Sequence, residues 1–112
     1  MICDRFAVLV VPFPFADKPA EKRRPALVLS HVRFNSRGHT IMTMITTART
    51  PPWPGDVELR DLAAAGLQAP CIVRLKLFTL DNRLLVRLLG ALAADDRKRV
   101  TTQLSGYLFP KT

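Results

Sequence analysis

A short basic cluster directly before an apolar segment is the part of this sequence best suited to chemistry. Residues 22–30 read KRRPALVLS. Pro25 disfavours helix for the residue before it, so we expect Arg24 to leave an extended loop, with a defined direction, just as a strand begins. A guanidinium fixed in this way offers a planar set of donors that matches phosphoryl oxygens. The alternative is a solvated basic turn, because charged runs usually face water.

The net charge favours a polyanionic partner. The 112 residues include 17 Lys and Arg and 9 Asp and Glu, which gives +8 and favours nucleic acid or an anionic surface. Residues 1–50 hold eight basic and three acidic side chains, whereas residues 51–94 hold five and four, so the excess lies with the basic cluster. Residues 95–112 hold four and two, mostly on one expected helix, where we interpret them as a soluble outer face.

Length and composition predict one compact domain over residues 1–112, too short for two independent cores. No apolar stretch approaches the roughly 20 residues that cross a bilayer, and no secretion signal is visible, so we expect a cytoplasmic protein without membrane contact. Cys3 and Cys71 are then expected to be reduced thiols. Two distant cysteines and two unclustered histidines do not provide the spacing of a zinc site, and no metal or cofactor is expected.

Short apolar runs between turn residues predict a small sheet. Residues 7–11 (AVLVV) are too short for a helix and rich in Val, which indicates a buried strand that ends at Pro12. Strands are also expected over residues 26–30 and, after a turn at 35–38, over residues 39–47, so the first three strands should form an antiparallel meander. Later strands are expected over residues 57–59, 71–75 and 84–89, the last of them closed by Gly90.

Two helices complete the expected fold. A single turn over residues 62–65 begins at the capping residue Asp61 and is stopped by Gly66. From Asp95 onward, apolar residues fall on one stripe of an amphipathic helix that should pack across the sheet. The stripe consists of Val100, Leu104, Tyr107 and Leu108. The class is therefore α+β, a small, strongly bent antiparallel sheet or SH3-like partly open barrel with a C-terminal helix.

Two proline-rich segments, residues 12–15 (PFPF) and 49–55 (RTPPWPG), are expected to be loops. They carry aromatic side chains that either stack on the bases of a nucleic acid or pack at the edge of the core. These side chains are Phe13, Phe15 and Trp53.

Five segments in a fixed order resemble the PemK/MazF toxins of type II toxin-antitoxin systems. They are VVPFPFAD, KRRPALVLS, MITT, IVRLKLFTLD and the terminal helix, and together they cover nearly the whole chain. The resemblance implies a barrel-like sheet, a homodimer and a metal-independent endoribonuclease that cleaves single-stranded RNA such as mRNA. It also implies an antitoxin protein that neutralises the enzyme.

The same resemblance assigns a site residue by residue. The family's active arginine falls on Arg24, and its active hydroxyl residue falls on Thr46, with Thr47 as the neighbouring hydroxyl. The arginine of the family's V-V-R segment falls on Arg74, which implies a place beside the RNA path. Further phosphate contacts are expected from the remaining basic side chains near these segments, Lys22, Arg23, Arg49 and Lys76.

RNA carries its own nucleophile, so an enzyme that helps the 2′-hydroxyl attack the adjacent phosphorus needs only proton transfers and charge stabilisation. We expect Arg24 to stabilise the transition state, and Thr46 to position the 2′-hydroxyl or relay its proton. Without the resemblance, Thr46 and Thr47 would be interpreted as ordinary strand residues. His31 and His39 are the conventional proton carriers, but we expect both to lie on the surface without a catalytic role.

Three departures from the family pattern favour a second hypothesis. Phe6 and Ala7 stand where family members commonly begin the first strand with Gly-Asp, and Leu75 and Lys76 stand where an acid is often found. Glu21 lies nearer to the basic cluster than the family's loop glutamate. The alternative is therefore a non-catalytic module of the same fold that binds a nucleic acid, RNA or DNA, or a protein.

Overall fold

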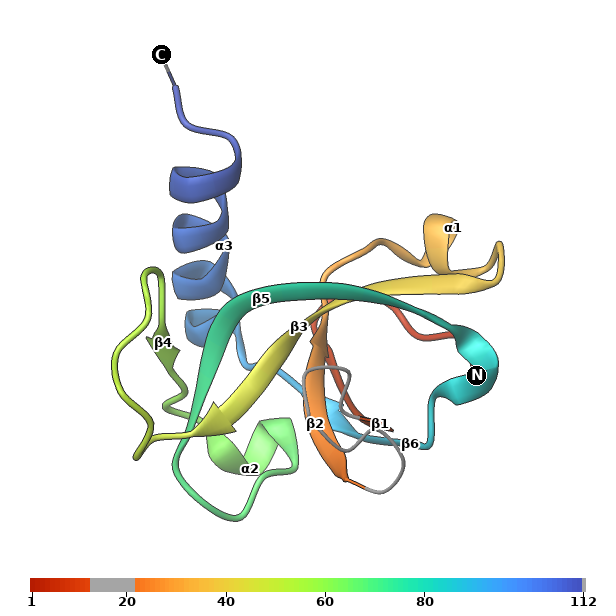
Figure 1. Cartoon of the computed structure of the whole chain (residues 1–112), viewed down its shortest axis with the longest axis horizontal. Coiled ribbons are helices and arrows are strands. Elements are labelled where there is room, and N and C mark those ends of the chain that lie inside the picture. The colour runs from red at the N-terminus through yellow and green to blue at the C-terminus, as the bar shows by residue number, and fades with distance from the viewer. Residues whose placement is uncertain (13–21, 112) are drawn as a thin grey trace.

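The computed structural model describes residues 1–12 and 22–111, which form a six-stranded antiparallel sheet with short helical turns in its connections and a longer C-terminal helix that packs on the sheet. The strands are β1 (Ala7–Pro12), β2 (Arg23–Val28), β3 (His39–Thr47), β4 (Val57–Glu58), β5 (Cys71–Asp81) and β6 (Arg87–Ala91). The helices are α1 (Val32–Asn35), α2 (Leu62–Ala65), the 3-10 turn η1 (Asn82–Leu84) and α3 (Ala94–Leu108). The predicted α+β class is confirmed, and Figure 1 shows the long strands β3 and β5 curving across the molecule.

The strand order is β4-β5-β3-β2-β1-β6. The first three strands are neighbours and antiparallel, as the expected meander requires. Two irregularities help the sheet to bend: Leu89 of β6 has no partner where β1 passes from Val8 to Leu9, and Leu75 and Lys76 of β5 have none where β3 passes from Thr43 to Met44. A β-bulge increases local twist and bends the strand that contains it, so the second irregularity bends β5 beside the middle of β3.

The alternation of side chains along the central strands divides the core between the two faces of the sheet. Val8 and Leu27 pack on one face with Val100 and Leu104 of α3, whereas Leu9 packs on the other face. The second cluster also contains Ala7, Val11, Ala26, Val28, Met42 and Leu85. Because side chains in a strand point alternately to opposite faces, an uninterrupted apolar run such as AVLVV supplies both clusters.

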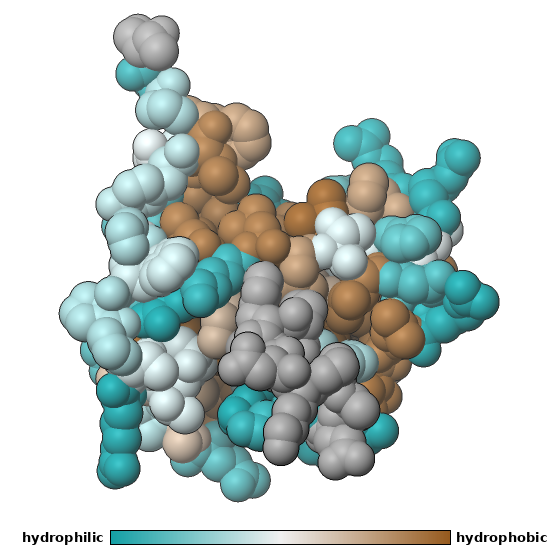
Figure 2. Space-filling view, viewed as in Figure 1, coloured by the Kyte–Doolittle hydropathy of each residue, from teal (hydrophilic) through white to brown (hydrophobic). Residues whose placement is uncertain are grey.

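Helix α3 packs on the sheet through only half of its predicted apolar stripe. Val100 and Leu104 are buried, but Tyr107 and Leu108 are exposed. The reason is geometric, because the C-terminal part of α3 extends beyond the sheet, as Figure 1 shows. In Figure 2 apolar residues gather between this part of the helix and the sheet. They line a groove of about 300 Å³ that includes Leu77, Leu108 and Phe109.

The second strand begins earlier than predicted. We expected a strand over residues 26–30 with Arg24 in a loop, but β2 spans Arg23–Val28 and includes both Arg24 and Pro25. Strand β1 explains the extension, because its last residues offer antiparallel partners as far as Arg23. The fixed φ of proline is compatible with an extended strand. Arg24 is therefore held more firmly than a loop residue would be.

The later strands also differ from the prediction. Strand β5 continues to Asp81 rather than ending at residue 75, because β3 pairs with it from His39 to Thr47. The strand predicted over residues 84–89 is displaced to Arg87–Ala91, since η1 occupies Asn82–Leu84. Gly90 does not close β6 but lies inside it, where a Cβ would come within 2.4 Å of the Ala64 carbonyl oxygen of α2.

The short helices illustrate what local signals can predict. Helix α2 has the predicted bounds, with the Asp61 carboxylate accepting the Ala64 N–H at 3.0 Å and Gly66 at φ 72°. Helix α1 was not predicted. It begins after His31, whose Nδ1 accepts the Arg33 N–H at 3.0 Å. Histidine is an uncommon N-cap, so the sequence gives little warning of this helix.

Three predictions concern residues outside the described ranges. Phe13, Phe15 and Glu21 lie in the segment between residues 12 and 22, so neither the expected PFPF loop nor the glutamate is described.

Cys3 and Cys71 are both free thiols. In the described part of the chain, no helix has both the length and the apolar character needed to span a membrane.

Candidate active site

The site lies where β2 and β3 separate. Their pairing consists of Ala26↔Met44, Leu27↔Thr43 and Val28↔Met42. Pro25 comes next in β2 and has no N–H to donate, so it cannot extend a ladder of backbone hydrogen bonds. If the register continued, Arg24 would stand opposite Thr46. The two strands instead diverge, and these two residues border an open space.

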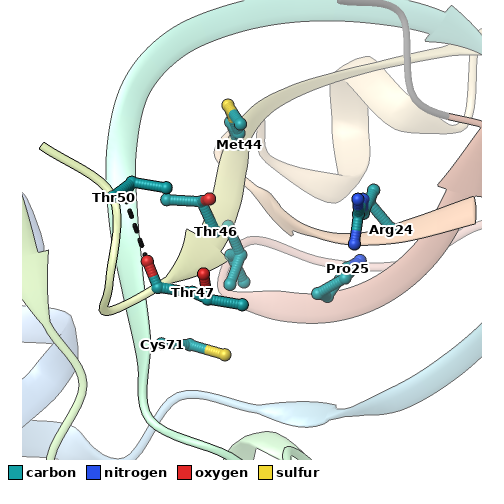
Figure 3. Close-up of a pocket in the computed structure, with 8 residues that line it drawn as sticks. Arg24, Pro25, Met44, Thr46, Thr47, Thr50 and Cys71 are labelled. Atoms are coloured by element: carbon teal, nitrogen blue, oxygen red, sulfur yellow. Dashed lines mark hydrogen bonds between the residues drawn. The ribbon is translucent and has the colours of Figure 1, made fainter. Parts of the chain in front are cut away.

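This space is a pocket of about 370 Å³. Figure 3 shows Arg24 and Pro25 on β2 facing Thr46 and Thr47 on β3, with Cys71 of β5 close to Thr47. The complete lining is Arg24, Pro25, Met44, Ile45, Thr46, Thr47, Thr50 and Cys71. The structure therefore brings together the predicted arginine and both predicted threonines, from segments about twenty residues apart in the sequence.

The lining combines one guanidinium with hydroxyl groups and apolar side chains. Arg24 is the charged residue of the described lining, which contains neither a carboxylate nor an imidazole. Burial raises the pKa of the Cys71 thiol, so this group stays protonated and weakly reactive at neutral pH. Partly apolar walls strengthen the attraction between a guanidinium and an anion, so the pocket is suited to a phosphate group.

Thr50 is a lining residue that the sequence analysis did not identify. Its hydroxyl donates to the Thr47 carbonyl at 3.1 Å, and this turn brings the start of the β3–β4 loop back to the pocket (Figure 3). The sequence gives only a weak indication that Thr50 belongs to the pocket. Hydrogen bonds from a Thr side chain to a backbone group three residues earlier are common in turns. Met44 was also missed, since a strand methionine normally indicates core.

Arg74 lies beside the pocket but is committed to another partner. Its side chain is 8% exposed, and its Nε and Nη2 donate to the two carboxylate oxygens of Asp56 at 3.1 and 2.9 Å. Nη2 also donates to the Pro51 carbonyl at 2.6 Å. The hydrogen bond to Asp56 raises the pKa of Arg74. In this arrangement Arg74 fixes the β3–β4 loop, and a direct RNA contact by Arg74 stays a prediction.

The other predicted RNA-binding residues occupy three places. Lys22 and Arg23 are exposed beside Arg24, and Arg49 is exposed just after β3. Lys76 lies over Trp53, with its Nζ 4.5 Å from the centre of the indole ring. The structure thus groups three cations at the ends of β2 and β3 and places the fourth on β5.

The two histidines lie away from the pocket. His31 caps α1 through its Nδ1, and His39 is exposed at the opposite end of β3 from Thr46, where it pairs with Asp81. Among the described residues, no group of three or more His, Cys, Asp or Glu side chains is arranged to hold a metal ion.

The structure shows how the chain accommodates Phe6 at the place where family members commonly have a glycine. Its φ is 73°, in the left-handed region that favours glycine. Its N–H donates to the Val28 carbonyl at 2.8 Å, and the guanidinium groups of Arg5 and Arg97 lie 4.7 and 5.5 Å from its ring centre. These contacts hold a non-glycine residue in the conformation for which a glycine is the usual choice.

Comparison with known proteins confirms the resemblance. Residues 4–108 match the family described as PemK-like, MazF-like toxin of type II toxin-antitoxin system. The chain belongs to this family. No curated protein sequence matches it.

Solved structures support the fold over nearly the whole chain. MazF from Deinococcus radiodurans is 26% identical, with a TM-score of 0.74 over 96% of this chain and 97% of that one. A MazE–MazF structure from the same organism is 25% identical, with a TM-score of 0.74 over 99% of each chain. An endoribonuclease in complex with its cognate antitoxin from a Mycobacterial species is 18% identical, with a TM-score of 0.76 over 98% of this chain and 99% of that one.

Proposed function

We propose that this chain is a toxin endoribonuclease that cleaves single-stranded RNA, including mRNA in the cytoplasm, without a metal ion. The observation that carries the proposal is the pocket between β2 and β3, across which Arg24 faces Thr46. Membership of the toxin family and the net charge of +8 agree with it. Two similar solved structures are described as endoribonucleases, which fits the same activity.

The proposed reaction is an internal transfer of the phosphoryl group. The 2′-oxygen of a ribose forms a bond to the adjacent phosphorus, and the bond from phosphorus to the 5′-oxygen breaks. The 2′-hydroxyl loses a proton and the leaving oxygen gains one, so the products are a 2′,3′-cyclic phosphate and a 5′-hydroxyl. Arg24 stabilises the negative charge that develops on the phosphoryl oxygens, which is the role a metal ion would otherwise supply.

Thr46 acts as a positioning group for the 2′-hydroxyl. A threonine hydroxyl is a weak base, but it can both accept and donate a hydrogen bond, so it can orient the nucleophile and pass on its proton. Its place near the end of a strand that is paired with β5 keeps its backbone at a constant position. Thr47 provides a second hydroxyl in the same pocket.

The exposed cations around the pocket would hold the RNA backbone. Lys22 and Arg23 at the start of β2, and Arg49 just after β3, extend the positive charge beyond Arg24. Lys76, which lies over Trp53, would contact a further phosphate. Arg74 would act through the β3–β4 loop, or directly on RNA only after its bonds to Asp56 are broken.

The proposed partners are an antitoxin protein and a second copy of this chain. One similar structure is described as a complex with a cognate antitoxin, and two others as MazE–MazF. The groove beside the C-terminal part of α3 is the surface we propose for the homodimer, since Phe109 on its rim is 77% exposed. Light scattering should give twice the mass of the chain, and Phe109→Asp should shift the protein towards monomer.

A second candidate is a non-catalytic module of the same fold that binds RNA, DNA or a protein. The observation that favours it is the absence of a carboxylate or imidazole from the described lining of the pocket. Without either group, proton transfer depends on weakly acidic and weakly basic side chains. This candidate predicts that the protein binds RNA tightly and leaves it intact.

The test is incubation of the purified protein with single-stranded RNA in excess EDTA. We expect cleavage with 5′-hydroxyl ends, and Arg24→Ala should reduce the rate by about 100- to 1000-fold because a charge-stabilising donor is lost. Arg37→Ala is the matched control, since Arg37 is an exposed arginine after α1, outside the pocket lining. Intact RNA, or cleavage that does not depend on Arg24, would contradict the proposed function.

A further inference from the structure

We infer that Trp53 is a stacking platform for an unpaired RNA base next to the cleaved linkage. The inference rests on the proposed function and extends it to a second binding site, on the β3–β4 loop. Trp53 is 41% exposed although it makes several contacts, and it is the single tryptophan of the chain.

The sheet register places Trp53 on the same side as the pocket. Arg74 stands directly opposite Met44, and directly opposite residues of antiparallel strands point to the same face. Met44 lines the pocket, and the Arg74 guanidinium lies 5.8 Å from the centre of the Trp53 ring. Thr50, three residues before Trp53 on the same loop, also lines the pocket. The tryptophan is therefore a neighbour of the pocket wall.

The loop holds the ring in one orientation. The backbone N–H of Trp53 donates to Asp56 Oδ2 at 3.0 Å, and its indole Nε1 donates to the Leu75 carbonyl at 3.3 Å. Asp56 is in turn fixed by the two hydrogen bonds from Arg74. An aromatic ring that is already oriented loses little conformational entropy when a base stacks on it.

The surroundings of the ring suit one nucleotide rather than an apolar ligand. Lys76 Nζ lies over the indole ring, 4.5 Å from its centre, so a base that stacks on this face takes the place of the ammonium group, which then lies at the edge of the stack. A stacked base carries its phosphate at its edge, where an ammonium group can meet it. Aromatic platforms with neighbouring cations are the usual means of holding single-stranded nucleic acid without reading its sequence.

The fluorescence of Trp53 gives a direct test, because no other tryptophan contributes. The probe is a 2′-O-methyl RNA oligonucleotide of about ten nucleotides, which fills a site but cannot be cleaved. We expect saturable quenching of the fluorescence by this oligonucleotide. The same backbone with abasic positions should bind more weakly and quench little, because it has phosphates but no bases.

Variants separate stacking from a structural role. Trp53→Ala should bind the labelled oligonucleotide about 5- to 100-fold more weakly by anisotropy and should no longer prefer bases over abasic positions. Trp53→Phe keeps a ring, so it should retain most of that preference even if Trp53→Ala unfolds. Phe34→Ala is the matched control, since Phe34 is 45% exposed but lies on α1, near the opposite end of β3, and should bind as the wild type does.

The possible outcomes keep this inference distinct from the proposed function. Saturated binding without quenching, unchanged binding by Trp53→Ala, or no binding at all would each overturn the stacking role. Quenching and base preference in a protein that does not cleave RNA would support the stacking role and contradict the nuclease. RNA cleavage by a protein whose fluorescence does not respond to the oligonucleotide would support the nuclease and contradict the stacking role.

Discussion

The two ends of β3 carry the same residue type in opposite situations. Near the first end, Thr40 is fully buried and its hydroxyl donates to Asn82 Oδ1 at 2.7 Å. Near the last end, Thr46 borders the pocket, and its hydroxyl makes no hydrogen bond to another residue of the described ranges. One threonine is used by the fold, whereas the other is open to a ligand.

The buried end is a closed network of polar groups. Asn35 Nδ2 donates to the Cys3 and Ser30 carbonyls at 2.7 and 2.9 Å, and the Ser30 hydroxyl donates to Asn35 Oδ1. Asn82 Nδ2 donates to the Asn35 carbonyl at 2.6 Å. Satisfied groups of this kind fix the relative positions of the segments that they join, here the N-terminus, α1, β3 and η1.

The comparison shows that residue type alone does not indicate function. A buried hydroxyl without a partner costs about 1 to 3 kcal/mol, so polar groups inside the fold are paired. An unpaired hydroxyl is tolerated where it faces water, and there it can also bind a substrate. At the open end of β3 the pairing with β2 ends at Ala26 and Met44, so Thr46 and Thr47 line the pocket, and the proposed function depends on this separation.

The largest effect on stability should come from opening the closed network. Asn35→Ala removes three hydrogen bonds and takes the donor from two partly buried carbonyl groups, so we expect the free energy of unfolding to fall by about 2 to 3 kcal/mol. Urea unfolding followed by circular dichroism measures it. Ser36→Ala, at the exposed neighbouring position, is the control. A loss no greater than that of Ser36→Ala would show that the network does not stabilise the fold.

The same substitution at both threonines tests the comparison directly. Thr40→Val leaves Asn82 Oδ1 without its donor and should lower the free energy of unfolding by about 1 to 2 kcal/mol, with little effect on cleavage. Thr46→Val should change stability by less than about 0.5 kcal/mol but reduce the cleavage rate at least about tenfold. Unfolding and cleavage assays on both variants measure the two properties. Equal effects of the two substitutions on either property would remove the distinction between the ends of β3.

The smallest effect concerns the rim of the closed network, where Asp81 precedes η1. The Arg83 guanidinium and backbone N–H lower the pKa of the Asp81 carboxyl below its usual range. A carboxyl whose pKa is lower in the folded state stabilises the fold above its unfolded pKa, and this contribution is lost as the pH falls through the folded value.

Arg83→Gln should therefore destabilise the protein slightly at neutral pH, by an amount that shrinks as the pH falls below about 4. Thermal unfolding midpoints of the variant and the wild type across this range measure the difference. A difference that stays constant down to the lowest pH would mean that the Arg83–Asp81 contact does not depend on the charge of the carboxylate.

Local signals predicted some elements with their correct bounds. Residues 39–47 alternate in the manner of a strand, and Asp61 and Gly66 specify both ends of α2, so β3 and α2 were predicted as observed. The continuation of β5 to Asp81 depends on pairing with β3, and the displacement of β6 depends on η1. Such features follow from partners elsewhere in the chain, which a single segment does not reveal.

In the candidate site, too, some features could be predicted from the sequence and others could not. The sequence motifs predicted that Arg24, Thr46 and Thr47 belong to one site, and the structure brings all three to one pocket. The bond between Arg74 and Asp56 joins residues 18 positions apart, and no motif indicates it. The resulting orientation of Trp53 could be recognised only from the structure.

The coupling between Arg24 and Thr46 is the most direct test of the account. Single-turnover cleavage of one RNA in EDTA would be measured for the wild type, Arg24→Ala, Thr46→Val and the double variant. If both side chains act on the same linkage, the double variant should be no slower than Arg24→Ala within about threefold, because the two losses overlap. Losses that multiply, or a wild-type rate in either single variant, would contradict a shared site across the pocket.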